Sequence, residues 1–219
     1  MPRLFLAIDL PADIKEAIEP LCCGLPGARW VPAEQIHLTL RFIGDLDHEL
    51  SAELYSGLKE VKAKPFPLHI KGLGTFPPRG KPRVLWLGLK KSDALIELRK
   101  KVDSVLRRLE IPLEKKKFAP HITIARLGKT PAPRLGNYLA ANNLFRQPPF
   151  RVTSFHLYSS ILKPAGAIHT CEAEYPLNPW WRRNNSDLLR RGGISRAQRT
   201  TCTPPRPRHH HSLYIEILT

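Results

Sequence analysis

Two short segments of the chain repeat one pattern of polar and apolar residues, and each segment has the composition of a β-strand. They are Ile36-His37-Leu38-Thr39-Leu40 and Pro120-His121-Ile122-Thr123-Ile124. Because side chains alternate between the two faces of a strand, we expect the histidine and the threonine of each segment on one face and the apolar residues on the other. Such a strand buries its apolar face in a core and presents a titratable ring beside a hydroxyl group on a rigid support.

The spacing of the two segments predicts two similar halves. His37 and His121 are 84 residues apart, which is close to half of residues 1–177, the part of the chain with regular apolar periodicity. We therefore expect two similar lobes that face each other and bring both histidines to one cleft. Imidazole groups titrate near neutral pH, so one histidine can act as a base while the other acts as an acid.

This arrangement suits hydrolysis of a phosphodiester. With a phosphate between the two rings, the base takes a proton from an attacking water and the acid protonates the departing oxygen. The hydroxyl groups of Thr39 and Thr123 can then donate to the non-bridging oxygens, where charge is held in the transition state. The chemistry requires no metal and no cofactor, and we expect neither.

Strands and helices are mixed in residues 1–177 without a regular alternation. Strands are expected at residues 3–9, 36–44, 67–76, 83–89, 119–126, 150–161 and 168–175. Helices are expected at residues 11–23, 48–62, 92–109 and 134–142. The pattern favours an α+β fold with antiparallel sheets over a doubly wound parallel sheet. In the segment around His156 the motif threonine is missing, so we expect a structural histidine there, with Tyr158 or Ser160 available to line the cleft.

The charge of the chain favours a polyanionic partner. The 219 residues carry 35 Lys and Arg against 19 Asp and Glu, a formal net charge of +16. This charge alone does not distinguish an RNA enzyme from an RNA-binding module.

The apolar runs are far shorter than the ~20 residues that span a bilayer, and the N-terminus lacks the pattern of a secretion signal. The four cysteines form no C-x-x-C pair. We therefore expect a cytoplasmic, monomeric protein with reduced thiols.

Composition changes near Pro179. Residues 178–219 contain eight Arg, no Lys and two acidic residues, and the apolar periodicity stops. A segment of this kind cannot bury enough apolar surface to offset its chain entropy, so we expect a mostly disordered tail with at best a short extended piece at residues 213–218. An arm that adds nonspecific RNA affinity is one interpretation, and a dispensable extension is the favoured one.

Four stretches of the chain match, in order, the signatures of a known family. They are RLFLAIDLP at 3–11, WVPAEQIHLTLRFIG at 30–44, FPPRGKPRVLW at 76–86 and FAPHITIAR at 118–126. Over residues 2–177 the chain resembles the two-histidine (2H) phosphoesterase superfamily, most closely the RNA 2',3'-cyclic phosphodiesterases, also called the LigT-like or 2'-5' RNA ligase family. The resemblance implies a bilobal fold in which each lobe is an antiparallel sheet flanked by helices, with both motifs in the central cleft.

The resemblance also implies roles for the motif residues. It makes His37 the proton donor and His121 the proton acceptor, with Thr39 and Thr123 binding the phosphate. The cyclic phosphate at an RNA end would be opened to a 2'-phosphomonoester, and a weak reverse 2'-5' joining of RNA ends is a further implied activity. The residue pattern itself is nearly symmetric and does not say which histidine is the acid.

Phe42 and Arg126 occupy corresponding places after the two motifs, and we expect them to contact a base and a phosphate. Core packing of Phe42 and a surface ion pair of Arg126 are the competing interpretations.

Two other functions remain open at this point. The same scaffold can act on a small cyclic nucleotide, such as ADP-ribose 1'',2''-cyclic phosphate, or on a 2'-5' oligoadenylate. A protein from a different class, a noncatalytic RNA-binding protein that keeps the histidines as relics, would also carry this charge.

Overall fold

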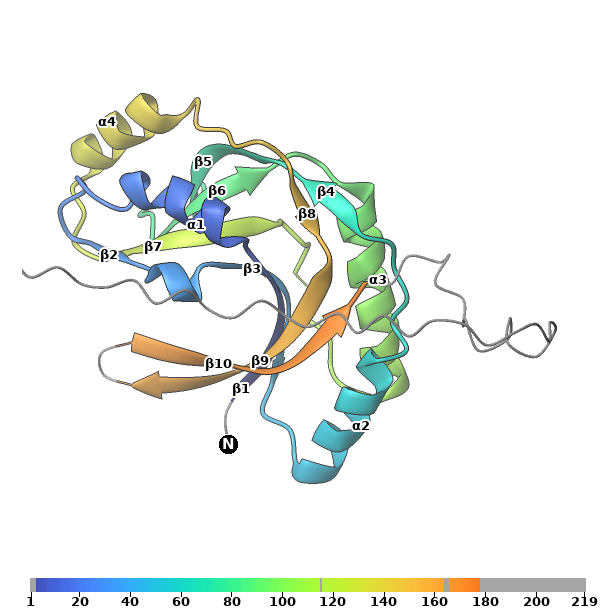
Figure 1. Ribbon diagram of the computed structural model, residues 1–219. Coiled ribbons are helices and arrows are strands. Elements are labelled where there is room, and N and C mark those ends of the chain that lie inside the picture. The colour runs from blue at the N-terminus through green and yellow to red at the C-terminus, as the bar shows by residue number, and fades with distance from the viewer. Residues whose placement is uncertain (1–2, 115, 164–165, 178–219) are drawn as a thin grey trace, which may run out of the picture. The chain divides into compact units, whose positions relative to one another are not determined.

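The computed structural model describes residues 3–114, 116–163 and 166–177 (Figure 1). Its strands are β1 (Arg3–Asp9), β2 (Ala28–Trp30), β3 (His37–Gly44), β4 (Phe66–Leu68), β5 (Ile70–Phe76), β6 (Val84–Leu89), β7 (His121–Leu127), β8 (Phe150–Val152), β9 (Ser154–Lys163) and β10 (Gly166–Pro176). Its α-helices are α1 (Ala12–Ile18), α2 (His48–Leu58), α3 (Asp93–Arg108) and α4 (Ala132–Asn142), and two 3-10 helices lie at Glu19–Leu21 and Ala33–Gln35. The predictions made for residues 178–219 lie outside the described residues.

The strands form antiparallel sheets. The larger sheet has the order β10-β9-β1-β3-β7-β6-β5, with β2 added beside β7, and β4 and β8 form a separate pair. The expected α+β fold with antiparallel sheets and flanking helices is confirmed. No helix within the described residues is long and apolar enough to cross a membrane.

The two motif strands are neighbours at the centre of the larger sheet. The register between β3 and β7 contains the pair Leu38 and Ile122, which are the apolar residues between the histidine and the threonine of each motif. One half of the sheet therefore runs outward from β3 through β1, β9 and β10, and the other half runs outward from β7 through β6 and β5. The two motifs come together because their strands meet at this pair.

Each motif strand contains a β-bulge at the same place. Along β3 the partners of Leu6 and Ala7 are Arg41 and Thr39, so Leu40 is the extra residue. The bulge in β7 is equivalent, since Ala125 and Thr123 pair with consecutive residues of β6. In a regular strand a residue five positions after the histidine would point to the opposite face. The bulge reverses the alternation, so the residues five positions after each histidine return to the motif face.

Helix α3 packs behind the motif strands. The Ser92 hydroxyl accepts a hydrogen bond from the Leu95 backbone N–H at 3.3 Å and so caps the helix, as its sequence predicts. The helix buries a stripe in the same core as the apolar residues of both motifs. That stripe consists of Leu95, Leu98, Val102, Val105 and Leu106. The apolar face of each motif strand is thus held in the core, and the histidine and threonine face is left for the cleft.

Two expected strands are each divided between the two sheets. The strand expected at residues 67–76 is β4 and β5, and the strand expected at residues 150–161 is β8 and β9. β4 pairs with β8 in the small sheet, whereas β5 and β9 belong to the large one. Apolar periodicity does not show where a strand changes partner. The first helix also ends at Ile18, earlier than expected, and continues as a 3-10 helix that contains Pro20, a residue without a backbone N–H to donate.

Candidate active site

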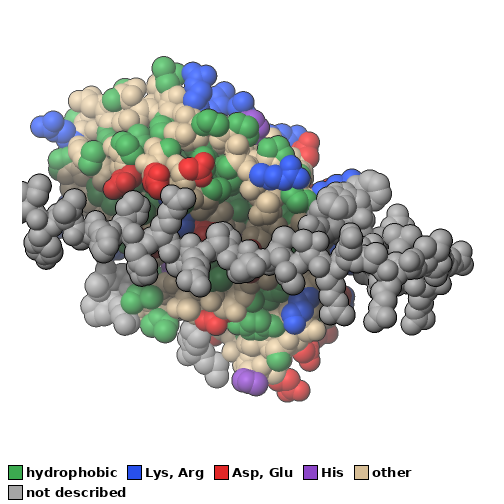
Figure 2. All heavy atoms as spheres, in the orientation of Figure 1, with side chains coloured by type: hydrophobic (Ala, Val, Ile, Leu, Met, Phe, Trp, Pro, Cys, Tyr) green, Lys and Arg blue, Asp and Glu red, His purple; other side chains and the backbone are tan. Residues whose placement is uncertain are grey.

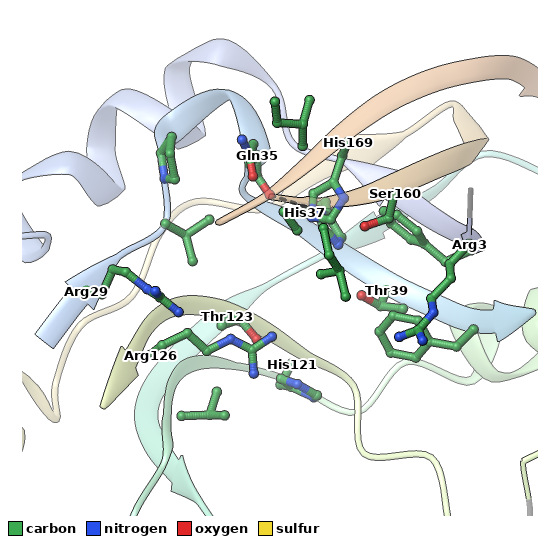
Figure 3. A pocket seen from close by; sticks show the side chains of 18 of the residues that line it. Arg3, Arg29, Gln35, His37, Thr39, His121, Thr123, Arg126, Ser160 and His169 are labelled. Atoms are coloured by element: carbon green, nitrogen blue, oxygen red, sulfur yellow. Dashed lines mark hydrogen bonds between the residues drawn. The ribbon is translucent and has the colours of Figure 1, made fainter. Parts of the chain in front are cut away.

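An open cleft of about 1310 Å³ lies over the motif faces of β3 and β7 (Figure 3). The structure brings all six predicted site residues to its walls. They are His37, Thr39, Phe42, His121, Thr123 and Arg126. Of the two cleft candidates on β9, Ser160 is part of the wall, whereas Tyr158 stacks behind His37 with ring centroids 6.1 Å apart.

The two histidine rings are held in the same way. Nδ1 of His37 lies 2.7 Å from the backbone oxygen of Gln35, and Nδ1 of His121 lies 2.7 Å from that of Ala119. Because a carbonyl oxygen can only accept a hydrogen bond, Nδ1 carries the proton in both rings. A neutral ring therefore keeps a bare Nε2 that can accept a proton, and a protonated ring donates one from Nε2. Both rings can serve as acid or as base.

The surroundings of His37 are aromatic. Its ring lies 5.1 Å from that of Phe5, which is 2% exposed, and 5.5 Å from the edge-on ring of His169. Burial lowers the pKa of His37 to about 4, the hydrogen bond to the Gln35 carbonyl opposes this shift, and the neighbouring imidazole of His169 adds to it. At neutral pH His37 is therefore uncharged in this environment.

His121 has its own aromatic support from the other half of the sheet. Its ring packs edge-on against Phe76 at 4.8 Å and lies 6.3 Å from Trp86, with distances measured between ring centroids. Each catalytic candidate is thus fixed by one backbone hydrogen bond and by aromatic packing from neighbouring strands, which restricts its rotation.

Because of the two bulges, the aromatic side chain of Phe42 and the cationic side chain of Arg126 lie on the cleft face of their strands. Phe42 is 55% exposed and lies 5.9 Å from the ring of Phe5, so it is not an ordinary core residue. Arg126 is exposed and stands directly opposite Arg29 in the β2–β7 register. Like charges opposite each other in a sheet repel, and within the described residues neither arginine has an ion pair. The surface ion pair considered for Arg126 is absent from this part of the chain.

The sequence of the chain is similar to those of known proteins. A family model described as the 2'-5' RNA ligase superfamily matches residues 10–162. A protein of Archaeoglobus fulgidus named RNA 2',3'-cyclic phosphodiesterase is 33% identical over 170 residues, which cover 76% of this chain and 96% of the relative. One of the same name from Thermotoga maritima is 36% identical over 173 residues, covering 76% and 91%.

The chain belongs to the 2'-5' RNA ligase superfamily. Several solved structures have the same fold. The protein TT0787 of Thermus thermophilus matches with a TM-score of 0.67 and 29% identity over 80% of this chain and 97% of its own. LigT of E. coli complexed with 3'-AMP matches with a TM-score of 0.67 and 27% identity over 81% and 99%. The family resemblance expected from the four signatures is confirmed.

Several side chains at this superfamily site were not predicted from the sequence. Arg3, Arg29 and His169 line the cleft, as does Phe5, whose ring contacts those of His37, Phe42 and His169. Burial lowers the pKa of His169, and the positive charge of Arg126 adds to the shift. His169 could not be found from the motif pattern, because no threonine follows it two positions later.

Within the described residues, no group of three or more His, Cys, Asp or Glu side chains is arranged to hold a metal.

Cationic side chains line the cleft beside the motifs. On the face shown in Figure 2, Lys and Arg side chains form separate groups divided by apolar and acidic side chains. The arginines in the cleft are Arg3, Arg29 and Arg126. The cleft therefore carries positive charge that can attract an anionic ligand.

The low pKa of His37 gives a prediction for stability. Because this group has a pKa of about 4 in the folded protein and a usual value of 6.5, the unfolded chain binds more protons between pH 6.5 and pH 4. The free energy of unfolding should fall as pH decreases through this window, by about 2 kcal/mol from His37 alone between pH 7.5 and pH 4.5. Urea unfolding of the wild type and of His37→Gln at both pH values measures it. The decrease should be smaller in the variant, and equal decreases would contradict the buried, neutral state of His37.

Proposed function

We propose that the chain hydrolyses the 2',3'-cyclic phosphate ends of RNA to 2'-phosphomonoesters, using its two His-x-Thr motifs and no metal. The observation that carries the proposal is the pair of imidazoles held alike through Nδ1 in one cleft, each beside a threonine hydroxyl. The names of the relatives from A. fulgidus and T. maritima support the same substrate.

The proposed reaction is an in-line displacement at phosphorus. One histidine takes a proton from water through Nε2 as the water oxygen bonds to phosphorus. The bond from phosphorus to O3' breaks, and the other histidine donates its Nε2 proton to the departing O3'. The phosphate remains on O2'. Hydroxyl groups of Thr39 and Thr123 donate to the non-bridging oxygens and stabilise the charge that they carry.

We assign His37 as the proton donor and His121 as the proton acceptor, following the family resemblance. Burial lowers the pKa of His37 and keeps its ring neutral at neutral pH, so a donor role requires that the ring take up a proton when the substrate binds. A phosphate anion beside Nε2 favours the charged form of an imidazole and raises its pKa, which supplies the physical reason for this uptake. The exchanged assignment, with His37 as the base, is the competing proposal, and a substrate whose leaving group needs no proton distinguishes the two.

We further assign substrate contacts to the two residues delivered by the bulges. The exposed ring of Phe42 offers a stacking surface for a nucleobase, and stacking of this kind tolerates every base. The Arg126 guanidinium offers a charge-assisted hydrogen bond to a phosphate oxygen. We propose that residues 1–177, with two pseudo-symmetric lobes, form the catalytic domain and that residues 178–219 take no part in the chemistry. We expect this domain to act as a monomer in the cytoplasm.

The same groups can support a weak 2'-5' joining of RNA ends. If a 5'-hydroxyl takes the place of water, the base removes the hydroxyl proton and the alcohol oxygen attacks phosphorus. Loss of O3' then leaves a 2'-5' phosphodiester. Because water is present at far higher concentration than an RNA end, hydrolysis should dominate.

Product analysis in a chelator tests the proposal. An RNA oligonucleotide with a 2',3'-cyclic phosphate end, incubated with the protein in EDTA, should yield a 2'-phosphate end and no 3'-phosphate end. Separation of the two products by chromatography against synthetic standards gives the result. A strict requirement for a divalent metal would refute the mechanism. A 3'-phosphate product would keep the site but reverse the orientation of the substrate, and a small cyclic nucleotide hydrolysed in place of RNA would change the substrate class.

A further inference from the structure

Three polar side chains form a row across neighbouring strands on one wall of the cleft. Arg3 of β1 pairs with Ser160 of β9, and Ser160 pairs with His169 of β10. All three line the cleft, and Figure 3 shows them together on one side of the motif residues. β10 has no counterpart in the other half of the sheet, where the strands from β7 outward are β6 and β5. The row therefore breaks the near-symmetry of the two motifs.

The donors of this row have no partners in the part of the chain that the structure describes. Arg3 is exposed and forms no ion pair there, and the Ser160 hydroxyl makes no hydrogen bond there. Nδ1 of His169 is buried without a partner, so the ring can reach a ligand in the cleft only through Nε2. A guanidinium, a hydroxyl and an imidazole that each donate a hydrogen bond suit the oxygens of a phosphate group.

The position of the row beside the motif residues indicates which phosphate group of an RNA substrate it can bind. The His169 ring lies 5.5 Å from that of His37, and both His169 and the exposed Phe42 contact Phe5, at 5.0 and 5.9 Å between ring centroids. The row and the stacking surface thus share one wall. A cyclic phosphate is the end of an RNA chain, so the ribose, its base and the rest of the chain all extend to one side of the reacting phosphorus. A terminal base stacked on Phe42 would leave the preceding phosphodiester within reach of the same wall.

We propose that Arg3, Ser160 and His169 form a subsite for the phosphodiester immediately upstream of the terminal nucleotide. The subsite rests on the proposed function and adds a substrate preference to it. An RNA oligonucleotide has this phosphate and a cyclic mononucleotide with a free 5'-hydroxyl does not. The enzyme should therefore favour RNA ends over cyclic mononucleotides. Arg29 and Arg126 line the cleft beside the second motif and are the competing location for the upstream phosphate.

Three substrates separate the charge of the upstream phosphate from the rest of the nucleotide. They are adenosine 2',3'-cyclic phosphate, the dinucleotide ApA with a 2',3'-cyclic phosphate end, and the same dinucleotide with an uncharged methylphosphonate linkage. We expect kcat/KM of the wild type to be at least tenfold higher for the charged dinucleotide than for the mononucleotide. The methylphosphonate should lose most of this preference. Arg3→Ala should lower the ratio of the two kcat/KM values about tenfold, Ser160→Ala about threefold, and Arg3→Lys less than Arg3→Ala.

The controls make each outcome decisive. Arg151→Ala removes an exposed arginine of β8 that does not line the cleft, and it should keep the wild-type ratio. An unchanged ratio in Arg3→Ala, or a ratio that falls in Arg29→Ala instead, overturns the subsite. Equal kcat/KM for the mononucleotide and the charged dinucleotide in the wild type also overturns it but leaves the proposed function standing. Failure of the wild type to hydrolyse any of the three substrates removes the proposed function and the subsite with it.

Discussion

Replacing either cleft histidine by alanine should lower kcat for a cyclic phosphate end by about 10²–10⁴-fold, the usual contribution of a positioned acid or base. His37→Ala and His121→Ala each remove an Nε2 that the backbone hydrogen bonds of Nδ1 aim into the cleft. KM should change much less than kcat, because the threonines and arginines that we propose as phosphate contacts remain. Single-turnover hydrolysis of a labelled RNA end measures both variants.

A matched control separates this effect from a general loss of histidine. His48 is exposed at the start of α2 and does not line the cleft, so His48→Ala should retain kcat within about twofold. If either cleft variant retains more than a tenth of the wild-type kcat, that histidine is not the acid or the base of the reaction. Full RNA affinity together with no turnover in the wild type would instead favour the noncatalytic RNA-binding protein.

A substrate with sulfur in place of O3' shows which histidine is the acid. A thiolate leaves without receiving a proton, whereas the attacking water must still lose one. The variant of the acid should therefore recover most of its activity on the sulfur substrate, and the variant of the base should not. With His37 as the donor, recovery is expected in His37→Ala. Recovery in His121→Ala would exchange the roles and agree with the lowered pKa of His37.

The motifs could be predicted because their signal is local. Alternation along a single strand already puts His37 and Thr39 on one face, whatever the partner strands are. The shared positions of Phe42 and Arg126 were also visible, but the bulges that turn them into the cleft depend on the register with β1 and β6. A sequence pattern contains no information on such register shifts.

The remaining cleft residues depend on contacts between distant parts of the chain. Arg3, Ser160 and His169 come together only because β1, β9 and β10 pair in that register. Arg29 reaches the cleft on β2, which has three residues and is too short for any periodicity to reveal. Apolar patterns identify the buried face of a strand, but strand pairing decides which polar residues become neighbours.

Arg41 lies in the first motif strand beside the exposed Phe42, but it has a structural role in the core. Arg41, the residue before Phe42, is 4% exposed and donates from Nε and Nη2 to the carboxylate of Asp103 on α3, at 2.8 and 2.6 Å. Its Nη1 donates to the backbone oxygen of Glu114 at 3.3 Å. One guanidinium thus joins the bulge of β3, the helix behind it and the loop that leads toward β7.

Removing the carboxylate should strongly destabilise the protein. Asp103→Leu leaves the buried guanidinium of Arg41 unpaired and also removes the anion 3.9 Å from Arg99. Breaking a buried ion pair by removing one partner costs about 3–5 kcal/mol. At about 2–4 °C per kcal/mol, Tm should fall by roughly 6–20 °C. Urea unfolding and thermal unfolding at neutral pH measure the change, and a loss below about 1 kcal/mol would show that the pair contributes little.

The double variant Arg41→Met with Asp103→Leu should recover part of that loss, because it removes the uncompensated charge of Arg41 and fills the site with apolar side chains, whereas Arg99 still lacks its anion. Arg41→Met alone should cost less than Asp103→Leu alone, since Asp103 keeps Arg99 as a neighbour. The four proteins form a double-mutant cycle, and additive losses would mean that the two side chains do not act as a pair. If the double variant is stable but binds RNA ends with a raised KM, the ion pair serves to hold the β3 bulge and, through it, the ring of Phe42. A stable double variant with unchanged KM would show that the ion pair contributes to folding stability and not to substrate binding.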